Sequence, residues 1–251
     1  MHGIRMAPVA ATILIASFAA RTAAADPVQV SGPNWAGYAA TAPSGATLSF
    51  TSAQGEWREP AVSCGAGSAG AKSAIWVGLG GFVGNGLEQI GTNANCDSRG
   101  RPAYSAWFEL LPYIAYPIKA KVRPGDTLAA QVSVEGTAVR LQLQNLTRRW
   151  TVTKNLSSES PDTSSAEWIV EAPIACSAYA CSPSRLANFG SVSITNVAAA
   201  TTSESGALTD PAWSVAAIRL VPGAATAAPG AAPAPVSADG QAFSVLWAPG
   251  V

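Results

Sequence analysis

Residues 128–144, LAAQVSVEGTAVRLQLQ, carry a clear secondary-structure pattern. Apolar side chains occupy every second position from Leu128 to Val134, and again from Val139 to Leu143. A period of two is typical of a β-strand with one buried face. The pair Glu135-Gly136 between the two runs is typical of a tight turn. The stretch therefore predicts an antiparallel hairpin whose apolar face lies in the core.

The rest of the chain extends this pattern and contains no convincing amphipathic helix of normal length. Trp150 to Lys154 repeats the alternation after another turn. Pro222 to Ser237 is rich in Ala, Pro and Gly without periodicity, so we expect a loop at 222–237. We predict an all-β fold in a single domain, residues 26–251. Further strand candidates are residues 46–58, 73–79, 86–91, 103–111, 166–171, 189–198, 212–220 and 241–247.

The first 25 residues have the pattern of a secretory signal. Arg5 precedes an apolar stretch from Ala7 to Ala20, and Ala23-Ala24-Ala25 forms a small-residue cleavage site before Asp26. The apolar stretch is short for a membrane-spanning helix, although an uncleaved anchor is the alternative. We therefore predict that residues 1–25 are removed and that the mature protein is secreted, without membrane association.

Composition excludes several kinds of catalytic site. The only histidine, His2, lies in the expected signal, so the mature chain can form neither a Ser-His-Asp nor a Cys-His apparatus. Zinc held by histidine is excluded for the same reason. The mature net charge is about −2, which gives no indication of nucleic-acid binding. We expect no metal and no cofactor, since the alternating oxygens of Asn93, Asn95 and Asp97 lack further acidic calcium ligands nearby.

The four cysteines predict two disulfides, because the chain is expected to be exported and the count is even. Three connectivities are possible. The short spacing favours a bond between Cys176 and Cys181, which leaves Cys64 to pair with Cys96. A metal site of four thiolates is disfavoured, since the spacings are not of the CxxC type.

Three predicted strands carry polar residues at positions that share a face. Glu167 and Glu171 alternate with Ile169 between them, and Gln89 lies two positions from Leu87. A third strand places Ser105, Trp107 and Glu109 on one face. Such a face could be the floor of a hydrated cleft, or the ordinary solvent face of an antiparallel sheet. The alternation alone leaves both readings open.

Several motifs, in order and spacing, resemble the eqolisin family of glutamic peptidases over about residues 34–220. The fold that this resemblance implies is a sandwich of two long, curved antiparallel sheets like that of the concanavalin lectins. The motifs are NWAGY at 34–38, WVGLGG at 76–81, LEQIG at 87–91, YSAWFELLP at 104–112, AEWIVE at 166–171 and FGSVSI at 189–194.

The resemblance implies that Gln89 and Glu171 are the catalytic pair. It also implies a short disulfide between Cys176 and Cys181. The chain departs from fungal members of the family, which have an aspartate where Gly80 stands and another where Ser105 stands. The positions expected to line or support the cleft are Trp35, Trp76, Ser105, Trp107 and Glu109.

The implied chemistry is hydrolysis of peptide bonds in proteins or peptides by a monomeric acid endopeptidase. Glu171 would take a proton from the attacking water, and Gln89 would donate to the oxyanion. A protonated carboxyl such as Glu109 could donate a hydrogen bond that keeps Glu171 charged. One alternative is a glycosidase with Glu109 and Glu171 as its carboxyl pair. The other is a carbohydrate-binding module with tryptophans as stacking platforms.

Overall fold

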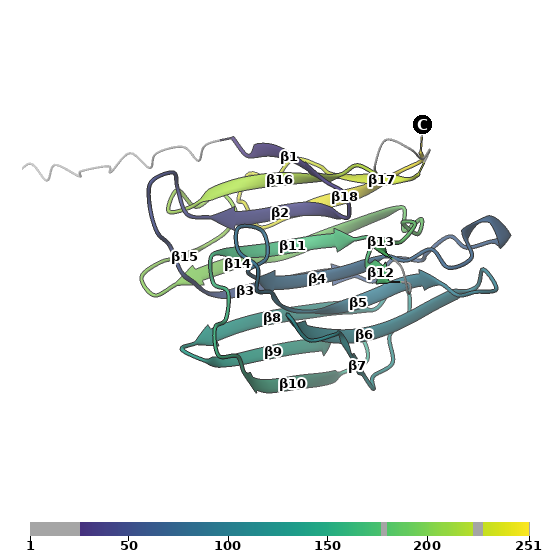
Figure 1. The fold of residues 1–251 in the computed structure, drawn as a ribbon, viewed down its shortest axis with the longest axis horizontal. Helices are drawn as coiled ribbons and strands as arrows, with labels where there is room; N and C mark the ends of the chain where they lie inside the picture. Colours follow the sequence, from purple (N-terminus) through teal and green to yellow (C-terminus); the bar gives the residue numbers. More distant parts are fainter. Residues whose placement is uncertain (1–25, 177–179, 223–227, 251) are drawn as a thin grey trace, which may run out of the picture.

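The computed structural model describes residues 26–176, 180–222 and 228–250, whose regular secondary structure is almost entirely β-strand (Figure 1). The expected signal, residues 1–25, lies outside these ranges. One 3₁₀ turn spans Ala66–Ser68, and no helix in the described ranges is long and apolar enough to cross a membrane. The strands are β1 (Val28–Gly32), β2 (Trp35–Thr41), β3 (Phe50–Arg58), β4 (Ala74–Leu79), β5 (Glu88–Cys96), β6 (Pro102–Leu110), β7 (Tyr116–Ile118), β8 (Thr127–Glu135), β9 (Ala138–Asn145), β10 (Trp150–Ser157), β11 (Ser165–Glu171), β12 (Ile174–Cys176), β13 (Cys181–Pro183), β14 (Ser191–Thr201), β15 (Ser205–Gly206), β16 (Ser214–Leu220), β17 (Gly230–Pro233) and β18 (Phe243–Ala248).

The predicted hairpin is strands β8 and β9, joined at a turn in which Gly136 has φ +58°. Val132 pairs with Leu141 across the hairpin, and both side chains are fully buried. The third run of alternation, β10, pairs antiparallel with β9. The period of two therefore identified these strands correctly, because one face of each packs into the core.

The strands form two layers around a shared apolar core. Strands β10, β9, β8, β3 and β14 make one layer, and β16, β2, β11, β4, β5, β6 and β7 make the other. Strands β18 and β17 continue the pairing from one layer to the other. Strand β4 packs over β3 and β8, and β5 over β8 and β9. The predicted sandwich of antiparallel strands is confirmed, with one parallel exception, β1 on β16. Fully buried side chains of this core include Phe50, Trp57, Ile75, Leu79, Ile90, Leu128, Leu141, Trp168 and Ile194.

Some strands lay outside the sequence prediction. Residues 222–237 were expected to be a loop, but Gly230–Pro233 forms β17, which pairs with β16 and β18. Strand pairing uses backbone groups, so a run of Gly, Ala and Pro pairs without any alternation in side chains. Strand β2 lies between β16 and β11, and its residues 36–40 are all buried. A strand that is buried on both faces shows no alternation of apolar and polar residues, so the sequence pattern did not predict β2.

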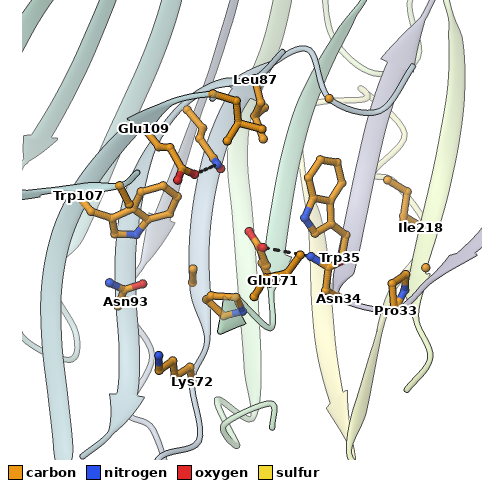
Figure 2. A pocket seen from close by; sticks show the side chains of 18 of the residues that line it. Pro33, Asn34, Trp35, Lys72, Leu87, Asn93, Trp107, Glu109, Glu171 and Ile218 are labelled. Atoms are coloured by element: carbon orange, nitrogen blue, oxygen red, sulfur yellow. Dashed lines mark hydrogen bonds between the residues drawn. The ribbon is translucent and has the colours of Figure 1, made fainter. Parts of the chain in front are cut away.

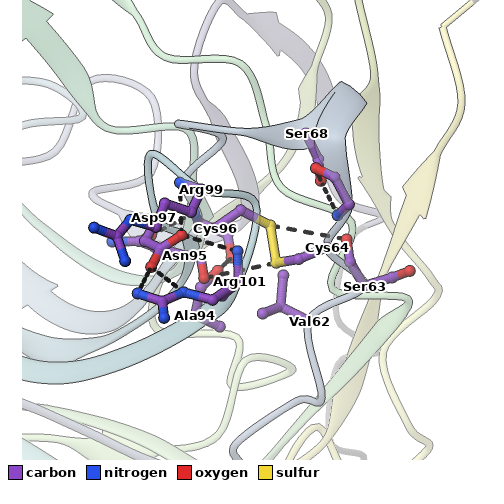
Figure 3. The surroundings of a disulfide bond; sticks show 12 residues. Val62, Ser63, Cys64, Ser68, Ala94, Asn95, Cys96, Asp97, Arg99 and Arg101 are labelled. Carbon is purple, nitrogen blue, oxygen red and sulfur yellow. Dashed lines mark hydrogen bonds and ion pairs between the residues drawn. A yellow bond between two sulfur atoms is a disulfide. The ribbon is translucent and has the colours of Figure 1, made fainter.

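Both expected disulfides are present. Cys64 and Cys96 join the segment after β3 to the end of β5, with Cα atoms 5.6 Å apart (Figure 3). Cys176 and Cys181 join the two strands of the β12–β13 pair. The described residues contain no free cysteine.

Candidate active site

The outer face of the β2–β11–β4–β5–β6 layer brings the predicted polar residues together. Residues directly opposite each other on paired strands share a face, and the registers form three rows. The Glu171 row and the Gln89 row lie four residues apart along the strands. The rows are Trp35–Glu171–Ala74–Asn93–Ser105, Gly37–Ile169–Trp76–Gly91–Trp107 and Ala39–Glu167–Gly78–Gln89–Glu109.

This face is hollowed into a cleft of about 700 Å³. In Figure 2 the carboxyl groups of Glu109 and Glu171 point into the same space, and Trp35 and Trp107 stand on either side of it. Trp76 is fully buried beneath the cleft. The polar face of these strands is therefore the floor of a cleft and not an ordinary solvent face. Of the predicted site residues, those lining the cleft are Trp35, Gln89, Ser105, Trp107, Glu109 and Glu171.

The Glu171 carboxyl group accepts hydrogen bonds from two neutral side chains. Trp76 Nε1 donates to Oε2 at 2.8 Å, and Asn34 Nδ2 donates to Oε1 at 3.1 Å. Burial raises the pKa of Glu171 to about 7, and the nearby Glu109 carboxylate adds to the rise. The hydrogen bonds, foremost that from Trp76, oppose this because they favour the charged form. Glu171 is thus a carboxyl group that takes up and releases a proton in the weakly acidic to neutral range.

Gln89 is held by Glu109. Its Nε2 donates to Glu109 Oε2 at 2.6 Å, from the opposite position on the neighbouring strand. The Gln89 Oε1 atom is buried and has no hydrogen-bond partner among the described residues. Burial raises the pKa of Glu109. Glu109 thus bonds to Gln89 and not to Glu171, which is bonded by Trp76 and Asn34.

Aromatic packing and glycine shape the cleft floor. Trp35 meets Trp76 edge to face, with ring centroids 5.0 Å apart. A Cβ on Gly91 would clash with the backbone carbonyl oxygen of Ile75 and would lie 2.7 Å from the Trp76 Cβ, which is closer than real side chains pack. Gly91 thus allows the close approach of β4, the strand from which the Trp76 indole reaches Glu171.

A second cluster of carboxyl groups lies beside the cleft, and only its member Glu167 was singled out in the sequence. Gly80, at φ +80°, lies against Asp162, whose Oδ2 accepts from Gly81 N at 3.3 Å. An aspartate side chain thus stands beside the position where the family resemblance implied one. Glu88 and Glu167 complete the cluster. Burial raises the pKa of Glu88 to about 7 and that of Glu167 well above its usual range, and the charge of Asp162 raises both.

The described residues contain no group of three or more His, Cys, Asp or Glu side chains placed to hold a metal ion. The Asp97 carboxylate, a candidate calcium ligand in the sequence, instead forms an ion pair with Arg101 at 2.8 Å. It also accepts the backbone N–H groups of Arg99 and Arg101. Asp97 therefore stabilises the turn at residues 97–101 through these contacts.

The model of the peptidase A4 family matches residues 33–226. Among solved structures, scytalido-glutamic peptidase with a peptide-based transition-state analogue superposes with a TM-score of 0.70 and 22% identity, over 86% of this chain and 98% of that one. SCP-B, an eqolisin in complex with the tripeptide Ala-Ile-His, gives 0.65 and 22% over the same shares. Aspergilloglutamic peptidase from Aspergillus niger gives 0.57 and 24%, over 70% and 99%.

A search of curated protein sequences finds no match. The structural likenesses confirm the fold, and the family match covers most of the chain. The match to the peptidase family model favours a peptidase over the two alternatives, a glycosidase and a carbohydrate-binding module. This protein belongs to the peptidase A4 family, the eqolisins, and is a peptidase of the glutamic type.

Proposed function

We propose that this chain is a secreted endopeptidase that works in weakly acidic solution, with Glu171 as general base and Gln89 as oxyanion donor. The observation that best supports the proposal is the state of Glu171. It is a carboxyl group in a cleft, held by two neutral donors, with a pKa of about 7. A general base is most effective when its pKa lies near the working pH.

The reaction follows from these groups. Ionised Glu171 takes a proton from a water molecule, whose oxygen bonds to the scissile carbonyl carbon while the carbonyl π electrons move to oxygen. The second N–H of Gln89, beyond the one given to Glu109, donates to this oxyanion. Glu171 then gives its proton to the amide nitrogen as the C–N bond breaks. The products are a carboxylic acid and an amine.

Glu109 acts as a positioning residue for Gln89. An amide side chain can rotate, and the 2.6 Å hydrogen bond to Glu109 fixes which of its atoms faces the cleft. When Glu109 loses its proton, its charge lies next to the Gln89 amide and opposes the negative charge that develops on the oxyanion. We therefore expect activity to fall again on the alkaline side.

Secretion and substrate class follow from other features. Two disulfides are typical of exported proteins, and residues 1–25 have the pattern of a signal. The 700 Å³ cleft is open and lined by aromatic side chains, as a segment of unfolded protein or a peptide requires. We propose that the enzyme acts as a monomer.

Digestion of a denatured protein by the mature enzyme, from pH 3 to pH 8, tests this function. We expect internal cleavage that is best in the weakly acidic range and survives chelators, serine-protease reagents and thiol reagents. Complete loss of activity with a chelator would instead indicate a metal mechanism.

A further inference from the structure

The cleft is lined by one positively charged side chain, Lys72, which has no part in the proposed mechanism. Its ionisable lining residues, among those that the structure describes, are Glu109, Glu171 and Lys72. Figure 2 shows Lys72 at the opposite end of the cleft from Glu109. Neither of the two salt bridges found in the described ranges involves Lys72. Its ammonium group therefore lines the cleft without an ion-pair partner among the described residues.

The backbone of Lys72 is fixed on both sides, so the place of its side chain is set by the fold. Its N–H donates to Arg185 O at 2.9 Å, and its C=O accepts from Ala187 N at 2.9 Å. Lys72 lies two residues before Ala74, which stands opposite Glu171. By alternation it occupies the same face, one row beyond the Glu171 row.

Charge in the cleft depends on this lysine when the solution is acidic. Burial raises the pKa of Glu171 to about 7, so this carboxyl group is largely protonated in acidic solution. Burial raises the pKa of Glu109 as well, which favours its neutral form. Aspartate and glutamate side chains of a peptide are still ionised at about pH 5.5. Under these conditions the cleft presents a positive end to a substrate that carries negative charge.

We propose that Lys72 selects peptide substrates with a carboxylate close to the cleaved bond. The carboxylate is that of an aspartate or glutamate side chain, or of a free C-terminus. Two residues along a strand and one strand across place the Lys72 backbone roughly 8 Å from that of Glu171. An extended peptide advances about 3.3 Å per residue, so the carboxylate lies within about four residues of the cleaved bond. This inference rests on the proposed function.

The test uses C-terminally amidated peptides with one cleavable bond, in which a single glutamate is moved through the four positions on each side. Each peptide is compared with its glutamine counterpart at pH 5.5, and kcat/KM is measured by mass spectrometry. We expect the wild-type enzyme to prefer glutamate at one position about two- to five-fold, as a partly exposed ion pair supports. A further pair of peptides, amidated and free at the C-terminus, identifies the second source of carboxylate.

Three variants separate charge from shape. Lys72→Met should lose the preference, Lys72→Arg should keep it, and Lys72→Glu should prefer lysine at the same position. Lowering the pH to about 3 should abolish the preference of the wild-type enzyme, because the peptide carboxylate takes up its proton.

Two results would overturn the inference. Either no peptide carboxylate is preferred by an enzyme that cleaves the peptides well, or the preference persists in Lys72→Met. Absence of any cleavage by the wild-type enzyme would be a different failure, because it would refute the proposed peptidase activity itself.

Discussion

At the scale of single residues, the account depends on how a carboxyl group is set up as a base. Glu171 is bonded by an indole and an amide, neither of which titrates in the working range. The donors therefore act in the same way at every pH. Within this set the group that changes charge is Glu171, whose pKa burial raises to about 7, and its ionisation defines the acid limb of the expected pH profile.

Asn34→Ala tests the donors. Removing a hydrogen bond that favours the ionised form raises the pKa of Glu171 further. A base must be ionised to act, so the acid limb of kcat/KM should move to higher pH by a few tenths of a pH unit. Asn93→Ala is the matched control, because Asn93 lines the same cleft but bonds to Ser105 instead. An acid limb that moves equally in both variants would refute this role for Asn34.

The sequence predicted part of this site and missed part of it. Alternation placed Gln89, Glu109 and Glu171 on strand faces, and resemblance to a family gave them roles. Asn34 was quoted within a motif but had no assigned role, because it meets Glu171 only across 137 residues of sequence. Asp162 was missed entirely, since it lies in a segment without periodicity and reaches Gly81 only through the fold.

Among the strands, pairing builds the cleft floor. The close approach of neighbouring strands limits which side chains can replace the residues between them. Strands β4 and β5 approach so closely that Gly91 leaves room for the Trp76 side chain. The sequence predicted both strands from their apolar residues. It could not predict that Ile75 and Trp76 on β4 lie directly against Gly91 on β5, because that contact depends on register.

Gly91→Ala should destabilise the protein by about 1–3 kcal/mol, because the added Cβ displaces Trp76 or bends β5. Since Trp76 donates to Glu171, kcat should fall as well. Gly65→Ala is the control, as a Cβ there meets no atom within 4 Å. Urea unfolding and steady-state kinetics measure both effects. Equal stability of the two variants would show that β4 and β5 can separate without cost.

At the scale of the whole molecule, buried carboxyl groups tie stability to acidic pH. Glu59 lies between the two layers, where its Oε2 accepts from Thr92 Oγ1 at 2.6 Å. Burial raises its pKa to about 8. The pKa values of Glu88, Glu167 and Glu171 are raised by the same cause. The folded protein thus holds protons that the unfolded chain releases near pH 4.5.

The sign of the effect follows directly. Below about pH 4.5 both states are protonated, and the stabilisation from a neutral Glu59 is fully present. As the pH rises towards 8, the unfolded state releases its proton first, so the free energy of unfolding falls. One such group contributes up to about 1.4 kcal/mol per pH unit over this interval.

Glu59→Gln should therefore make the free energy of unfolding less steep between pH 5 and pH 8. Glu135→Gln is the control, since Glu135 is exposed at the end of β8. Urea unfolding at a series of pH values gives the slopes. A slope unchanged by Glu59→Gln would mean that Glu59 does not hold its proton in the folded protein.

Glu171 and Gln89 are proposed to act on one water molecule and one tetrahedral intermediate. The most direct test is kcat/KM for the wild-type enzyme, Glu171→Gln, Gln89→Ala and the double variant, with folding confirmed by circular dichroism. We expect losses of at least about 10²-fold for Glu171→Gln and about 10²–10³-fold for Gln89→Ala. The double variant should be little worse than Glu171→Gln, because groups that serve one step are not additive. A correctly folded Glu171→Gln that cleaves at nearly the wild-type rate would contradict the account.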